Sequence, residues 1–212
     1  MATIDEVVKA YYLHRSQGMM IPLNNLHRRY STMTSITQPM AKDLLEGAHQ
    51  ERMIYATNYH YAKLFREVCK RLKSSTLLKD SFKSFEEFHE AVYNLLMKPT
   101  KVIGVGNLTI YDIALRIGYV RKEQILPKDK IYLFAGAFKG ANNLLNSSPS
   151  LFNVSTIKEG VYDMSIFNSP LSNMPSMFLE DLLCVYDTKL RKYKKMKYSD
   201  FQKVPFYCFL YQ

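Results

Sequence analysis

Apolar residues recur at helical spacing along most of the chain. Between Gln38 and Lys73 the periodicity is long and clear, with apolar residues on one face and cations off it. We expect two helices in this segment, because Gly47 and Tyr59 leave room for an interruption. The same periodicity elsewhere predicts a mainly α fold, a multi-helix domain with little or no β structure.

A second helical segment has clear start and stop signals. Ser84-Phe85-Glu86-Glu87 is a capping box, which predicts that a helix begins here. Apolar residues follow at positions 85, 88, 92, 95 and 96, and Pro99 is expected to end the helix. A new helix is predicted after Gly106, to about Gly118. The segment from about 84 to 118 is therefore predicted to be two helices joined by a tight turn.

The remaining segments carry weaker signals. Positions 130–134 favour a short strand or the lead into a helix, and residues 146–176, rich in Ser, Asn and Pro, are expected to be irregular. We expect residues 1–212 to form a single helical domain. Further helices are predicted from the capping box at Thr3 to about His14, near 23–30, over 136–145, and from about 176 into a basic run at 189–197.

Composition narrows the class of protein. Of the 212 residues, 47% are hydrophobic, enough for a sizeable core, and the formal net charge of +10 attracts anions such as nucleic acid. No apolar run approaches the ~20 residues of a membrane span. Asp5 and Glu6 stand where a secretion signal would carry positive charge. We therefore expect a cytoplasmic protein that does not lie in a membrane.

Metal and cofactor chemistry is not indicated. The three cysteines, Cys69, Cys184 and Cys208, are far apart and odd in number, which argues against a disulfide framework or a metal site. The five histidines show no paired-ligand spacing. A dinucleotide-binding loop is excluded because Thr109 stands where a third glycine is needed. We expect no metal and no cofactor.

The turn Val102-Ile103-Gly104-Val105-Gly106 carries the most specific chemistry in the sequence. Its two glycines allow positive φ and a close approach by a ligand, and Val105 is expected to anchor the turn in the core. The helix that follows presents free N–H groups and the positive end of its dipole, where a phosphate binds without base readout. The residues expected to contact nucleic acid are Lys98, Lys101, Ile103, Gly104, Val105, Gly106, Asn107 and Thr109.

These residues resemble the helix-hairpin-helix DNA-binding motif, whose hairpin follows the pattern apolar, Pro, Gly, apolar, Gly. The chain departs from the pattern in having Ile103 in place of the proline, which leaves both glycines in place. The resemblance implies contact with the phosphate backbone of double-stranded DNA. Residues 109–118 and 131–141 also resemble a group of uncharacterised bacterial proteins, and this second resemblance implies no function.

The first resemblance extends to the alkylated-base branch of the helix-hairpin-helix DNA glycosylases, through Gly104–Thr109, Ala114–Arg116 and Leu126–Asp129. In that superfamily an aspartate after the hairpin stabilises the cationic sugar formed when a flipped base departs, so the resemblance implies Asp129 as the catalytic carboxylate. Leu108 replaces the lysine nucleophile of the bifunctional members, which argues against lyase activity. The alternative for Asp129 is a solvated turn or an ion pair between lysine neighbours.

A run of cations near the end of the chain is a second candidate contact. Six positive charges fall within positions 189–197, interleaved with tyrosine, a composition that suits phosphate contacts and base stacking. A solvated helix end is the alternative, because cations also suit the negative end of a helix dipole. The residues expected to bind nucleic acid here are Lys192, Lys194 and Lys195.

Three functions remain open from the sequence. The first is non-enzymatic, sequence-nonspecific DNA binding through the hairpin, as an accessory to DNA repair or to a mobile element. The second is a monofunctional base-excision DNA glycosylase that uses Asp129. The third is a protein-interaction module whose basic surface meets an acidic partner, with no nucleic-acid role.

Overall fold

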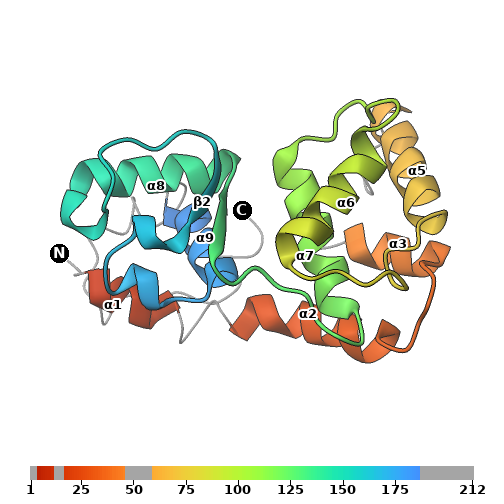
Figure 1. Ribbon diagram of the computed structural model, residues 1–212, viewed down its shortest axis with the longest axis horizontal. Helices are drawn as coiled ribbons and strands as arrows, with labels where there is room; N and C mark the ends of the chain where they lie inside the picture. The colour runs from red at the N-terminus through yellow and green to blue at the C-terminus, as the bar shows by residue number, and fades with distance from the viewer. Residues whose placement is uncertain (1–3, 12–16, 46–58, 187–212) are drawn as a thin grey trace. The chain divides into compact units, whose positions relative to one another are not determined.

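The computed structural model describes residues 4–11, 17–45 and 59–186, and it is mainly α, as predicted (Figure 1). The chain divides into two compact units. Unit 1 combines Met1–Ile21 with Pro127–Gln212, and unit 2 is the continuous segment Pro22–Leu126. The expectation of a single helical domain, which came from the length of the chain, stays a prediction. Helical spacing carries no information on the division into units, since it reports which face of a helix is buried and not which helices share a core.

Unit 2 is built around a buried helix, α7, from Asn107 to Val120 (Figure 1). Its side chains from Ile113 to Val120 are all buried, including Arg116, whose guanidinium donates to the backbone oxygens of Asp43 and Leu44 at 3.3 and 2.7 Å. The other helices of this unit are α2 (Gln17–Tyr30, which begins in unit 1), α3 (Gln38–Leu45), α5 (Tyr59–Lys73) and α6 (Phe85–Met97).

The start and end of α6 follow the predicted signals. The Ser84 hydroxyl accepts the Glu87 N–H at 3.3 Å, and the Glu87 carboxylate accepts the Lys83 N–H at 2.7 Å. These bonds satisfy N–H groups that a helix start leaves without partners. The helix ends at Met97, two residues before Pro99, so both boundaries that the capping box and the proline predicted are confirmed.

Unit 1 packs helices against a two-stranded sheet. Strand β1 (Lys130–Leu133) pairs antiparallel with β2 (Gly160–Asp163), and an ion pair of 3.1 Å joins Lys130 to Asp163. Helices α8 (Ala135–Ser147) and α9 (Ser176–Val185) approach so closely at Gly140 that a Cβ there would lie 1.9 Å from the Leu183 carbonyl oxygen. The helices of this unit are α1 (Ile4–Ala10), α8 (Ala135–Ser147) and α9 (Ser176–Val185).

The segment 146–176, expected to be irregular, contains β2 and three short 3-10 helices. These are η2 (Pro149–Leu151), η3 (Met164–Ile166) and η4 (Leu171–Asn173). Several of its apolar side chains, among them Phe152, Phe167 and Leu171, join the core of unit 1. The predicted strand at 130–134 is confirmed, whereas the basic run at 189–197 and the capping residue Thr3 lie outside the described residues.

Candidate nucleic-acid interface

The turn Val102–Gly106 joins α6 to α7, as the sequence predicted. The Val102 N–H donates to the Leu96 carbonyl at 3.0 Å, and the Val105 N–H donates to the Val102 carbonyl at 3.1 Å. Both valine side chains are buried, with 4% and 2% of their surface exposed, so Val105 anchors the turn in the core as expected. Two apolar anchors and two backbone bonds give the turn a defined conformation.

The two glycines of the turn serve different purposes. Gly104 has φ +93°, and a Cβ there would lie 3.1 Å from the Leu64 side chain, so this position needs glycine for its backbone conformation. Gly106 has φ −116° and ψ 178°, extended backbone that any residue adopts. The expectation of positive φ at both glycines is therefore wrong for Gly106. The position of Gly106 is open, because a Cβ there would meet no atom of the chain within 4 Å.

The start of α7 has several N–H groups without an acceptor among the described residues. Among the hydrogen bonds of the described residues, none has the N–H of Gly106, Asn107, Leu108 or Thr109 as its donor. We call these four groups the open amides. Gly106 and Asn107 are exposed, Leu108 and Thr109 are half-buried, and the first turn of the helix contains no acidic side chain. The positive end of the α7 dipole therefore faces outward without a capping anion.

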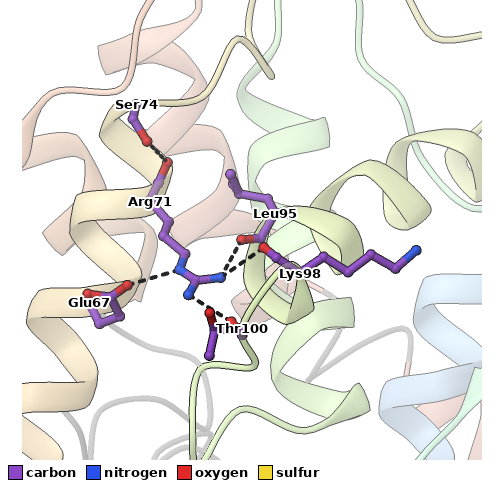
Figure 2. Close-up of polar contacts among 6 residues, drawn as sticks. All are labelled: Glu67, Arg71, Ser74, Leu95, Lys98 and Thr100. Atoms are coloured by element: carbon purple, nitrogen blue, oxygen red, sulfur yellow. Dashed lines mark hydrogen bonds and ion pairs between the residues drawn. The ribbon is translucent and has the colours of Figure 1, made fainter.

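Arg71 holds the chain segment that leads into the turn (Figure 2). Its guanidinium donates to the backbone oxygens of Leu95 at 3.0 Å, Lys98 at 3.3 Å and Thr100 at 2.8 Å. Its Nε also pairs with the Glu67 carboxylate at 3.0 Å. One side chain on α5 thus satisfies carbonyls at and beyond the end of α6. Arg71 is therefore not a solvated cation of the helix surface, since only 18% of its side chain is exposed.

Exposed lysines occur on the segment that enters the turn and on the helix that supports it. Lys98 and Lys101 are exposed on the segment that enters it, and Figure 2 shows the Lys98 side chain extended away from Arg71. Lys63 and Lys70 are exposed on α5. Lys63 precedes Leu64, which lies against Gly104, and Lys70 precedes Arg71, which bonds to the Thr100 carbonyl. Such charges raise the local concentration of anions.

One titratable group of α6 contributes no charge near neutral pH. Burial lowers the pKa of His89 to about 4, and the nearby Glu86 opposes this shift only in part. The imidazole is therefore neutral at pH 7. The positive charge of this region comes from its lysines and arginines.

The remaining predicted contacts have mixed outcomes. Ile103 is 88% exposed, and Asn107 is exposed at the start of α7, so both are accessible to a ligand. Thr109 is half-buried. Lys192, Lys194 and Lys195 lie outside the described residues.

Asp129 belongs to unit 1, whereas the hairpin belongs to unit 2. Its side chain is exposed, and its backbone oxygen accepts the Met164 N–H at 2.8 Å. A shallow depression in unit 1, lined by residues such as Leu145, Phe152 and Asn153, contains neither Asp129 nor any other titratable side chain. A catalytic role for Asp129 stays a prediction that no contact of the described residues favours.

Within the described ranges, no group of three or more His, Cys, Asp or Glu side chains is placed to hold a metal ion. The same ranges contain no helix with the length and apolar character needed to cross a bilayer. Comparisons with protein families, with curated proteins and with solved structures found no match for this chain. The resemblance to the helix-hairpin-helix motif therefore stays a prediction, and the geometry of the turn has to be assessed by its own chemistry.

Proposed function

We propose that this protein binds the phosphate backbone of double-stranded DNA, without sequence preference, through the open amides at the start of α7. The observation that supports this most is a set of four N–H donors that have no acceptor among the described residues, two of them on the exposed residues Gly106 and Asn107, next to a turn anchored by two buried valines. A rigid turn of this kind binds an anion with little loss of conformational entropy.

Phosphate is the anion that fits this chemistry. Successive N–H groups at a helix start form a concave donor set, and the helix dipole adds partial positive charge. The absence of a Cβ at Gly106 lets an anionic oxygen approach closely. Contacts made by backbone amides position a nucleic acid and read no bases, so binding is nonspecific in sequence.

A polymer of phosphates fits the charge distribution better than a single small anion does. The segment 22–126 carries 16 Lys and Arg against 10 Asp and Glu, a net charge of +6. The exposed Lys98 and Lys101, which precede the turn, would each neutralise one phosphate and release counterions. In this proposal the protein is cytoplasmic and serves DNA repair or a mobile element as an accessory without catalytic activity.

The test is a salt titration of binding to a duplex of about 30 base pairs. We compare the full chain with the double variant Lys98→Gln/Lys101→Gln and with a charge-matched control, Lys139→Gln/Lys158→Gln, whose lysines are exposed in unit 1. Loss of two phosphate contacts should reduce the slope of log affinity against log salt by about 1.8 in the first variant. The control should keep the wild-type slope.

Three results would contradict the proposal or its placement at the hairpin. One is no measurable affinity for duplex at ~50 mM salt, where backbone contacts are strongest. Another is equal affinity for DNA and for polyglutamate of matched charge, which would favour a protein-interaction module with an acidic partner. If both double variants have the same slope of log affinity against log salt, the hairpin lysines do not contact DNA.

A further inference from the structure

Ile103 lies at the tip of the turn and points an apolar side chain at solvent. It is 88% exposed, the largest value among the exposed large apolar side chains of the described residues. Its neighbours Val102 and Val105 are 4% and 2% exposed. The turn therefore directs two apolar side chains into the core and one away from it.

The fold itself gives no reason for an isoleucine at this position. Gly104 adopts the positive φ of the turn, and the two buried valines anchor the turn in the core. A polar residue at position 103 would be better solvated, and it would cost the core nothing. The exposed apolar group is thus explained more readily by what it contacts outside the chain.

The surroundings of Ile103 indicate which kind of partner this is. It lies three residues before the open amides, and Lys101, Gly104 and Gly106 around it are all exposed. An apolar partner surface would not attract lysines and would leave the open amides without acceptors. A nucleic acid offers anionic oxygens for the amides and lysines, and apolar base faces close to them.

We propose that Ile103 is an apolar wedge that enters DNA where the stacking of bases is interrupted, so that the protein prefers gapped or bulged DNA to intact duplex. Apolar side chains inserted between base steps unstack them and kink the duplex, at a free-energy cost that is smallest where a base is missing or unpaired. The β-branched side chain of isoleucine is stiff, so little entropy is lost when it is inserted. This inference depends on the proposed DNA binding and adds a substrate class to it.

The experiment measures affinity for two DNAs of the same sequence, one an intact duplex and one with a single-nucleotide gap. The variants are Ile103→Ser, which removes the wedge, and Ile103→Leu, which keeps an apolar side chain. A matched control is Met33→Ser, another exposed apolar residue of unit 2. Thermal unfolding of each variant measures any change in stability separately from binding, which matters most for Met33→Ser because that residue is only 36% exposed.

We expect the full chain to bind gapped DNA about tenfold more tightly than intact duplex, the scale of burying one isoleucine. Ile103→Ser should remove this preference and leave affinity for intact duplex within about twofold, since the phosphate contacts remain. Ile103→Leu and Met33→Ser should keep it. A fluorescent base analogue beside the gap should report unstacking with the full chain and with Ile103→Leu, but not with Ile103→Ser.

The outcomes separate this inference from the proposed function. No binding to either DNA would overturn the proposed function and the wedge with it. Equal binding to both DNAs by the full chain would overturn the wedge alone. A gap preference that survives in Ile103→Ser would also overturn it, because the preference would then arise elsewhere in the chain.

Discussion

The starts of α7 and α8 solve the same physical problem in opposite ways. Each helix begins after a residue whose side chain makes no capping bond, Gly106 and Phe134. At α8 the Glu159 carboxylate accepts the Ala135 N–H at 3.1 Å, so the chain supplies an anion to its own helix dipole. The first turn of α7 has no acidic side chain, and no described residue accepts a hydrogen bond from the open amides.

This difference shows that side chains of the chain accept hydrogen bonds from N–H groups at the start of other helices but not at the start of α7. The start of α6 uses one as well, with the Ser84 hydroxyl as acceptor and Glu86 and Glu87 in the first turn. An N-cap side chain contributes about 1 kcal/mol to stability. The start of α7 forgoes that contribution, and the lysines near it make an external anion the natural replacement.

Giving α7 its own anion should have the largest effect. Gly106→Asp places a favourable N-cap residue on backbone that is already extended, in open space. The carboxylate should occupy the open amides and repel phosphate, so DNA affinity should fall about hundredfold at low salt while the melting temperature stays the same or rises.

Gly106→Asn is the control for this change. The amide caps a helix about as well as a carboxylate but carries no charge. Its DNA affinity should lie between that of the wild type and that of Gly106→Asp in a fluorescence anisotropy titration. Unchanged affinity in Gly106→Asp, with the fold intact, would show that the open amides do not bind DNA.

Loosening the support of the turn should have the next largest effect. Arg71→Lys keeps the positive charge but cannot bond to three carbonyls and a carboxylate at once. We expect the free energy of unfolding to fall by about 2 kcal/mol, measured by urea denaturation, because carbonyls lose their donors. Lys70→Arg, at an exposed position on the same helix, should change it by less than about 0.5 kcal/mol. A loss as small in Arg71→Lys would mean that its bonds do not hold the lead-in to α7.

Removing the internal anion of α8 should have the smallest effect. Glu159→Gln keeps an oxygen acceptor for the Ala135 N–H but removes the charge. Glu159 is exposed, so the loss should be about 0.5 kcal/mol in thermal denaturation at low salt and should vanish at high salt. An effect that persists at ~1 M salt would show that the charge does not act on the helix dipole.

Local signals in the sequence predicted the hairpin well. The capping box at Ser84, the stop at Pro99 and the buried anchor Val105 depend on residues within a few positions of one another, and the structure has all three. The predicted helix near 23–30 is longer, from Gln17 to Tyr30, because Pro22 is accommodated inside α2.

Contacts between distant segments could not be predicted from the sequence. Arg71 bonds to carbonyls 24 to 29 positions along the chain, and Arg116 bonds to carbonyls more than 70 positions away. A backbone oxygen exists at every position, so no residue pattern identifies it as a partner. The strand β2 was missed for a related reason, since its partner β1 lies about 30 residues earlier and the strand is only four residues long.

The order of the two units along the chain has a consequence for folding. In unit 1 the Tyr11 hydroxyl donates to the Asp181 carboxylate at 2.9 Å, across 170 positions, whereas unit 2 is one continuous segment. Contacts between distant positions form late, because the loop between them must first close. On the ribosome, α7 emerges before α9 has been made, so the turn before α7 is expected to be in place while unit 1 still lacks α9.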